Sequence, residues 1–136
     1  EIMVPTAIIK GEKAIESQVF GLGIEGYHNF AVTLSNEDDE ELVFGVNEND
    51  EIFIDRSRAG DKTFSDIFAS AVFGKVEKKR LYRGAITMEA IFDVSMLEMF
   101  ADKGTFACAQ VVYPTKPYNR IAIEGKAEVT YYDVIL

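Results

Sequence analysis

Three carboxylates and a serine lie within one short stretch of the sequence, FDVSMLEMFADKG at residues 92–104. The acids are Asp93, Glu98 and Asp102, and the serine is Ser95. Paired carboxylates perform glycoside hydrolysis, and a serine beside an acid can belong to a hydrolase. The stretch is therefore either an active site or part of the frame of a sheet.

The alternation of apolar residues in this stretch favours the structural interpretation. Asp93 ends one apolar run, and we expect its side chain to accept a hydrogen bond from the main chain of Ser95 in an Asx turn. Residues 96–101 are predicted to form the next strand, on which Glu98 and Phe100 share one face. Because large apolar side chains flank Glu98 on that face, we predict that it makes a buried hydrogen bond that fixes the sheet.

Two other arrangements could support catalysis, and the residues favour neither. A free-standing enzyme could pair Glu98 with Asp93 or Glu89. A Ser-His-Asp or Cys-His arrangement would need His28, the one histidine of the chain, and no G-x-S-x-G motif accompanies it. We therefore expect a structural or exposed histidine.

The sequence gives no sign of a metal or cofactor site. Residues 47–51, NENDE, resemble the start of a calcium loop, but its sixth and twelfth positions hold Ile52 and Arg58 in place of glycine and glutamate. A solvated turn is the better interpretation. Cys108 is the single cysteine, so an internal disulfide is excluded and a cysteine zinc site is disfavoured; we expect a small buried strand residue. No cofactor is predicted.

A more pointed motif is DRSRAG at residues 55–60, which follows an apolar strand pattern. Two arginines beside an aspartate, closed by Gly60, could bind a carboxylate or a sugar hydroxyl. In the structural interpretation, Asp55 and Arg56 instead pin a strand end and its loop through charge-assisted hydrogen bonds.

The elements that must position these residues are short strands. Apolar residues recur with a period of two in runs rich in β-branched and aromatic side chains, at 20–24, 30–34, 42–46, 52–54, 86–92, 121–123 and 127–131. Polar turn sequences separate the runs, which is typical of an all-β sandwich or barrel. We find no linker or repeat, so residues 1–136 are predicted to form one domain, with residues 1–14 as a leading segment of unassigned pairing.

The turn sequences predict how some of the strands connect. Asp102-Lys103-Gly104 indicates a hairpin in which Gly104 takes a positive φ, and residues 124–126 are expected to join the last two strands in the same way. Residues 35–40 and 47–50 are polar loops. Residues 63–73 are interpreted as a long loop with one short helical turn.

Charge and length exclude several classes of function. The chain has 136 residues and a formal net charge of −9, which disfavours nucleic acid and anionic lipid as partners. No run approaches 18 consecutive apolar residues, so no membrane span is predicted. The sequence starts Glu-Ile-Met-Val without an initiator methionine or a signal peptide, and we expect a piece of a longer protein.

The ordered motifs resemble the C-terminal β-sandwich of glycoside hydrolase family 32, the invertases, levanases, inulinases and related β-fructosidases. The similarity covers roughly residues 15–136. Three positions depart from the family pattern: Val94 replaces an arginine, Met96 replaces a serine and Tyr113 replaces a phenylalanine. The matching positions are Ile54, Asp55, Arg56, Ser57, Phe64, Phe92, Asp93, Ser95, Glu98, Phe100, Gly104, Val112 and Pro114.

The resemblance implies an antiparallel two-sheet sandwich of the concanavalin or jelly-roll kind, with about ten strands. It also implies a parent enzyme that hydrolyses β-fructofuranosides with two carboxylates on an N-terminal five-bladed propeller. The family's catalytic motifs W-M-N-D-P-N, R-D-P and E-C are absent from this chain. We therefore expect an accessory domain that is inactive alone and that packs against the propeller and stabilises it. It could also help pair two subunits. The resemblance implies an extracellular or periplasmic location.

The alternative function is a fructan-binding module. Sugar-binding sandwiches stack sugars on exposed aromatic side chains, and this chain has no tryptophan. Tyrosines would have to serve, with Tyr27, Tyr82 and Tyr118 as the candidates for contact with a fructan oligosaccharide.

Overall fold

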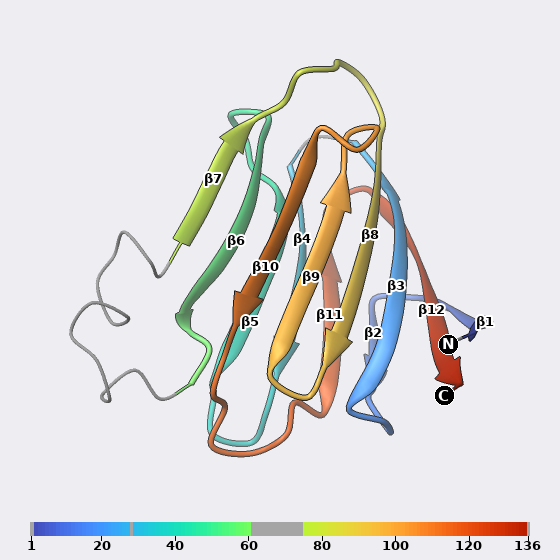
Figure 1. Ribbon diagram of the computed structural model, residues 1–136, viewed down its shortest axis with the longest axis vertical. Coiled ribbons are helices and arrows are strands. Elements are labelled where there is room, and N and C mark those ends of the chain that lie inside the picture. The colour runs from blue at the N-terminus through green and yellow to red at the C-terminus, as the bar shows by residue number, and fades with distance from the viewer. Residues whose placement is uncertain (1, 28, 61–74, 136) are drawn as a thin grey trace.

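The computed structural model describes residues 2–27, 29–60 and 75–135, and these form twelve strands in two six-stranded antiparallel sheets. The two sheets lie face to face, which confirms the predicted sandwich with slightly more strands than expected (Figure 1). The first sheet has the order β1-β12-β3-β8-β9-β10, and the second has the order β2-β11-β4-β5-β6-β7. The strands are β1 (Ile2–Ile9), β2 (Glu12–Ala14), β3 (Val19–Gly26), β4 (Phe30–Ser35), β5 (Glu41–Val46), β6 (Glu51–Arg58), β7 (Lys75–Lys79), β8 (Ile86–Asp93), β9 (Met96–Ala101), β10 (Phe106–Val111), β11 (Arg120–Glu124) and β12 (Ala127–Ile135).

The core lies between the sheets and follows the alternation of the sequence. On β8 every second residue from Ile86 to Phe92 is buried, while the residues between them face outward or are half-buried. The ring of Phe92 packs between those of Phe20 and Tyr118, with centroids 5.5 and 5.6 Å away. Each such side chain contributes about 1.5–3 kcal/mol through its removal from water.

The leading segment belongs to the sandwich. β1 is the edge strand of the first sheet and pairs with β12, with a shift in register between Pro5 and Ala7. β2 pairs with β11 in the second sheet. Periodicity alone could not assign these pairings, because both partners lie more than a hundred residues away along the chain. The first and last strands consequently lie together on one side of the molecule (Figure 1).

The predicted connections divide into two groups. The hairpins between β8 and β9 and between β9 and β10 are confirmed, and Gly104 has a φ of 82°. The hairpin predicted at residues 124–126 is wrong, because β11 and β12 lie in different sheets and this turn crosses from one to the other. Gly125 has a φ of 86°, and a Cβ there would lie 2.4 Å from the carbonyl oxygen of Asn29.

Two loops of the second sheet share one local structure. Asn36 and Asn47 each accept, through Oδ1, main-chain N–H bonds from the residues two and four positions later. Each also donates through Nδ2 to the glutamate four positions later, Glu40 or Glu51. The second loop is the one that resembles a calcium loop, and its asparagine serves as a turn former, as the solvated-turn interpretation predicts. Within the described ranges, no three His, Cys, Asp or Glu side chains gather to hold a metal.

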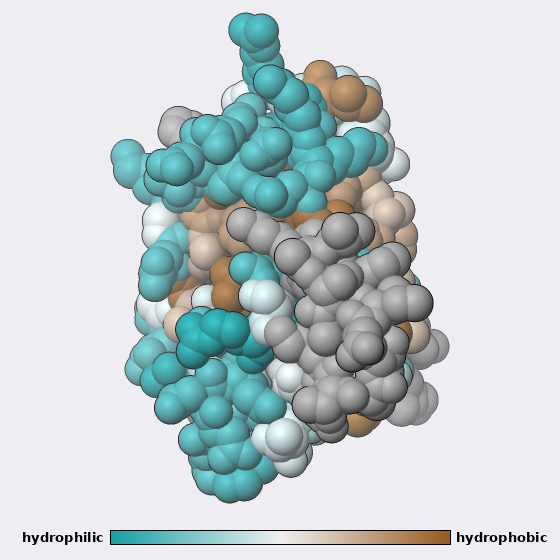
Figure 2. Space-filling model, turned by 90° about the vertical axis from the view of Figure 1, so that its left-hand side faces the viewer, coloured by the Kyte–Doolittle hydropathy of each residue, from teal (hydrophilic) through white to brown (hydrophobic). Residues whose placement is uncertain are grey.

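The surface on the β7 side is hydrophilic at its upper and lower ends, with hydrophobic residues visible between them (Figure 2). Glu77, Lys78 and Lys79 are exposed on β7, and charges on an edge strand oppose strand-to-strand association. In the part of the chain that the structure describes, no helix is long and apolar enough to span a membrane. His28, Phe64 and the predicted helical turn within residues 63–73 lie outside the described residues.

Candidate functional site

The DRSRAG motif has a structural role at the end of β6. The carboxylate of Asp55 accepts hydrogen bonds from the N–H and the hydroxyl of Ser57, at 2.9 and 2.6 Å. The guanidinium of Arg58 pairs with Glu41 on β5 at 2.9 Å. Asp55 thus makes the local structural bonds expected of it, while Arg58 forms an ion pair at this strand end.

Arg56 makes a contact between the two sheets. Its side chain points into the sandwich and is 5% exposed, and its Nε donates to Oε1 of Gln110 on β10 at 3.0 Å. Burial lowers the pKa of the guanidinium. Because β6 and β10 belong to opposite sheets, this bond connects the two layers of the sandwich.

The hairpin that carries the candidate acids is oriented opposite to the prediction. Leu97 and Met99 face the core, whereas Glu98 and Phe100 lie on the outer face of the first sheet and are exposed. The predicted buried hydrogen bond of Glu98 is therefore wrong. Apolar residues occupy both faces of this strand, so its periodicity did not indicate which face turns inward.

The turn between β8 and β9 is closed by main-chain groups. The N–H of Ser95 donates to the main-chain carbonyl of Asp93, so the expected Asx bond from the side chain does not close the turn. Val94 has a φ of 51°, an unfavourable conformation for a β-branched residue. The tip is held from both sides, since Val94 N–H donates to Gln18 and the carbonyl of Ser95 accepts from Val112, each at 2.8 Å.

The Val-Tyr-Pro segment contacts the end of the DRSRAG motif. A Cβ at Gly60 would lie 2.1 Å from the carbonyl oxygen of Tyr113 and 2.6 Å from the nitrogen of Pro114, so only glycine permits this approach. The nearby Tyr118 is fully buried and donates its hydroxyl to the carbonyl of Ala59 at 2.5 Å. Burial raises the pKa of Tyr118 above its ordinary value. A ring with no exposed surface cannot stack on a sugar, so the prediction of Tyr118 as a carbohydrate contact is wrong.

The other two candidate tyrosines are accessible, and both lie at or beside residues 80–85. Tyr27 is 60% exposed and Tyr82 is 40% exposed. Tyr82 belongs to residues 80–85, the connection between β7 and β8 that we call the 80–85 loop. A hollow of about 320 Å³ beside Tyr27 is lined in part by Gly84 of that loop.

A buried ion pair that the sequence did not reveal holds the 80–85 loop. Asp102, assigned from the sequence to a turn, is 3% exposed and binds the guanidinium of Arg80 at 3.0 Å. Its second carboxylate oxygen accepts the N–H groups of Leu81 and Tyr82, at 3.1 and 3.4 Å. Arg80 also donates to the carbonyl of Gly84 at 2.6 Å. The two charged residues lie 22 positions apart, and no local motif connects them.

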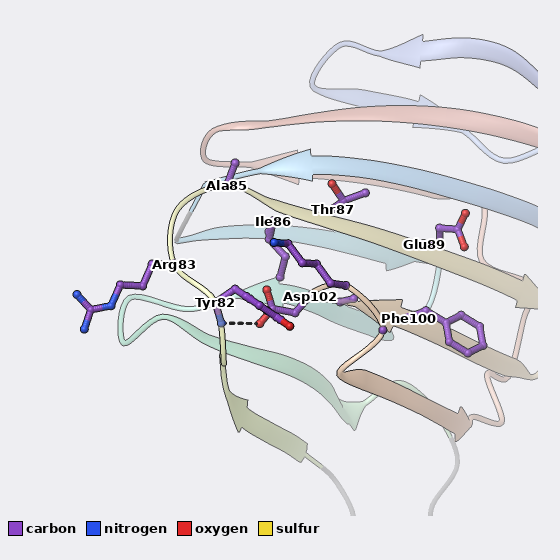
Figure 3. Close-up of a pocket in the computed structure, with 11 residues that line it drawn as sticks. Tyr82, Arg83, Ala85, Ile86, Thr87, Glu89, Phe100 and Asp102 are labelled. Atoms are coloured by element: carbon purple, nitrogen blue, oxygen red, sulfur yellow. Dashed lines mark hydrogen bonds between the residues drawn. The ribbon is translucent and has the colours of Figure 1, made fainter.

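The 80–85 loop also borders a pocket that is larger than the hollow beside Tyr27, and we call it the Tyr82 pocket (Figure 3). It has a volume of about 560 Å³ and opens on the outer face of the first sheet. Its lining includes Tyr82 from the loop, Thr87 and Glu89 from β8, Phe100 from β9 and Lys103 from the following turn. The pocket thus combines two aromatic rings with a hydroxyl, a carboxylate and an ammonium group.

Together these features define a β-sandwich domain whose motif residues mainly hold strand ends, turns and the two layers in place. The sequence of residues 12–134 matches the family described as Glycosyl hydrolases family 32 C terminal. The chain belongs to that family, which confirms the predicted resemblance. No curated protein matches the chain.

Solved structures share the fold at low identity. Exo-inulinase from Aspergillus awamori is 16% identical with a TM-score of 0.77, over 98% of this chain and 28% of that one. Sucrose-6-phosphate hydrolase from Lactobacillus gasseri is 16% identical with a TM-score of 0.73, and the match covers 95% of this chain and 28% of the hydrolase. Galectin LEC-6 from Caenorhabditis elegans, 13% identical with a TM-score of 0.61, is covered over 95% of its length. The chain therefore spans less than a third of the two hydrolases and nearly all of the galectin.

Proposed function

We propose that the chain is the C-terminal accessory domain of an enzyme that hydrolyses fructan or sucrose. The observation that supports this most strongly is the family match over residues 12–134. The hydrolases with the same fold contain it as 28% of their length, which leaves room for a separate catalytic domain. The candidate acids of this chain are surface or structural residues, so the chemistry is assigned to that other domain.

The role proposed for the accessory domain is to pack against the catalytic domain and stabilise it. The surface best suited to this contact is the edge formed by β1 and β12, which we call the β1–β12 edge. Ile2 and Ile135 pair with each other there and are 64% and 54% exposed, whereas Ile8, which is 53% exposed, pairs with Thr130 and lies on the other face of the sheet. Grouped exposed apolar side chains are typical of interaction surfaces. In a C-terminal domain, the preceding part of the parent chain arrives at β1.

The geometry of β12 supports a covered edge. Along one face of this strand Val129 and Tyr131 are buried in the sandwich, while Ile135 is exposed. Ile2 is the register partner of Ile135 and is exposed as well. The end of this strand pair therefore extends beyond the second sheet and presents apolar side chains that the sandwich itself does not cover.

Supplying the domain in trans tests this function. The catalytic domain of the parent enzyme is heated with and without this chain, and the chain is expected to raise its unfolding midpoint by several degrees, because binding to the folded state stabilises it. An Ile2→Asp/Ile135→Asp variant is expected to lose the effect. Leu81→Asp, which alters an equally exposed residue elsewhere, is the control and is expected to keep it.

Absence of any stabilisation by the unaltered chain would overturn the proposed function. Stabilisation that survives the double substitution would keep the function and reject the β1–β12 edge. The isolated chain is expected to hydrolyse neither sucrose nor inulin. A location outside the cytoplasm and pairing of two subunits stay predictions, and cell fractionation and sedimentation of the parent enzyme test them.

A further inference from the structure

The 80–85 loop exposes apolar groups although it is firmly held. Leu81 is 69% exposed and Tyr82 is 40% exposed, so a large part of each side chain stays outside the core. Their main-chain N–H groups are nevertheless bound by the buried carboxylate of Asp102. Something other than core packing must account for this order.

The ion pair that orders the loop is costly. The side chains of Arg80 and Asp102 are 2% and 3% exposed, and removing two charges from water costs several kcal/mol per ion before their attraction is counted. A buried pair is therefore weak evidence for stability alone. Here its hydrogen bonds fix Leu81, Tyr82 and Gly84. The ion pair thus holds the main chain that carries Tyr82 in place before any ligand arrives, which reduces the entropy lost on binding.

The walls of the Tyr82 pocket have the composition that a sugar needs. Phe100 is 42% exposed and is the register partner of Glu89, so an aromatic ring and a carboxylate stand side by side on the outer face. Thr87 lies on the same face of β8, two residues from Glu89. Tyr82 stands on the opposite side of the opening, with the Lys103 ammonium 4.5 Å from its ring centroid.

The charges of the pocket favour a neutral ligand. Glu89 and Lys103 contribute one charge of each sign, and Asp102 is neutralised by Arg80. Arg83 also lines the pocket, and Figure 3 shows its side chain directed away from Glu89 and Phe100, so its charge lies apart from these two groups. A phosphorylated sugar would find no buried pair of cations here, whereas hydroxyl groups would find both acceptors and a donor.

We propose that the Tyr82 pocket binds a neutral oligosaccharide, with Phe100 and Tyr82 as the apolar walls and Thr87, Glu89 and Lys103 as the hydrogen-bonding groups. The choice of a fructose-based oligosaccharide rests on the proposed function of the parent enzyme. Ala85 lines both the Tyr82 pocket and another hollow of about 320 Å³, which also borders Tyr27 but is distinct from the one lined by Gly84. A ligand of more than one sugar unit can therefore extend from the Tyr82 pocket toward Tyr27.

Calorimetric titration of this chain with the inulin-type trisaccharide 1-kestose tests the site. Binding of millimolar order is expected, because the pocket is open. Tyr82→Ala and Phe100→Ala should each weaken binding about tenfold, the loss that corresponds to about 1.4 kcal/mol. Tyr113→Ala is the matched control, since Tyr113 is a 46% exposed aromatic residue outside the pocket. The unfolding midpoint of each variant shows whether it is folded, and Glu89→Gln replaces any variant that is not.

Three outcomes would overturn the proposal. These are the absence of heat with 1-kestose, unchanged affinity in every folded pocket variant, and tighter binding of sucrose 6-phosphate than of 1-kestose. The first of these leaves the accessory function intact if the chain still stabilises the catalytic domain in trans. Binding of 1-kestose without stabilisation in trans would instead reject the accessory function and keep the site.

Discussion

Replacing Asp102 by alanine removes the carboxylate that holds the 80–85 loop and leaves a buried cation behind. The side chain of Arg80 is 2% exposed, and its remaining acceptors are the carbonyls of Gly84 and Ala85 and the carboxylate of Asp50 at 3.5 Å. Removing one partner of a buried ion pair costs about 3–5 kcal/mol. Two main-chain N–H groups lose their acceptor at the same time.

A loss of about 3–5 kcal/mol in the free energy of unfolding is large for a domain of 136 residues. Such domains have free energies of unfolding of about 5–15 kcal/mol, so the variant should unfold at a much lower urea concentration. The matched control is Glu41→Ala, which breaks the pair with Arg58. That pair has the same kind of atoms at 2.9 Å, but its side chains are 65% and 34% exposed. Exposed pairs contribute about 0–1 kcal/mol, so the control should lose little.

Urea unfolding followed by circular dichroism measures both losses. The reasoning would be refuted if Asp102→Ala lowered the free energy of unfolding no more than Glu41→Ala does. That result would mean that the buried arginine finds water or another acceptor. The double variant Arg80→Met/Asp102→Leu provides a second check. It should be more stable than Asp102→Ala, since it leaves no uncompensated charge in the protein.

Three further changes test other parts of the structure. Burial raises the pKa of Tyr118, so the folded state favours the neutral phenol. The stability that depends on this preference is complete below pH about 10 and falls as the pH rises further. Tyr118→Phe should therefore reduce the loss of stability at alkaline pH, as measured by urea unfolding. Val94→Gly should raise the free energy of unfolding by about 0.5–1 kcal/mol, because glycine adopts the positive φ of this position without the steric cost that valine has there. A destabilised variant would contradict this. Gly60→Ala, whose Cβ meets a main-chain carbonyl, should lower the melting temperature far more than Gly104→Ala, whose Cβ meets open space; similar losses would contradict the close approach.

The sequence predicted the elements that depend on local patterns. The period-two runs predicted most of the strands but not β1, β2 or β7, and the turn sequence at 102–104 predicted the hairpin between β9 and β10. The DRSRAG motif was recognisable because its bonds are local: Asp55 binds Ser57, two residues later. The composition of the two asparagine loops predicted polar loops, and the structure adds the bond from each asparagine to the glutamate four positions later.

Long-range features escaped the prediction for identifiable reasons. Residues 96–100 are apolar on both faces, so only the pairing of β9 with β8 decides that Leu97 turns inward and Glu98 outward. A glycine turn after β11 serves a hairpin and a crossing between sheets equally well. The partners of Arg56 and Arg80 lie 54 and 22 residues away, and no local spacing connects such pairs.

The sequence by itself determined the class of fold, the family and the absence of the family's catalytic motifs, because these follow from local alternation, turn chemistry and an ordered set of motifs. The tertiary structure alone decided which face of β9 is buried and which tyrosines reach solvent. It also brought Arg80 and Asp102 together and formed the Tyr82 pocket from β8, β9 and the 80–85 loop. The physical reason is that burial and ion pairing depend on neighbours in space, and the register between distant strands chooses those neighbours.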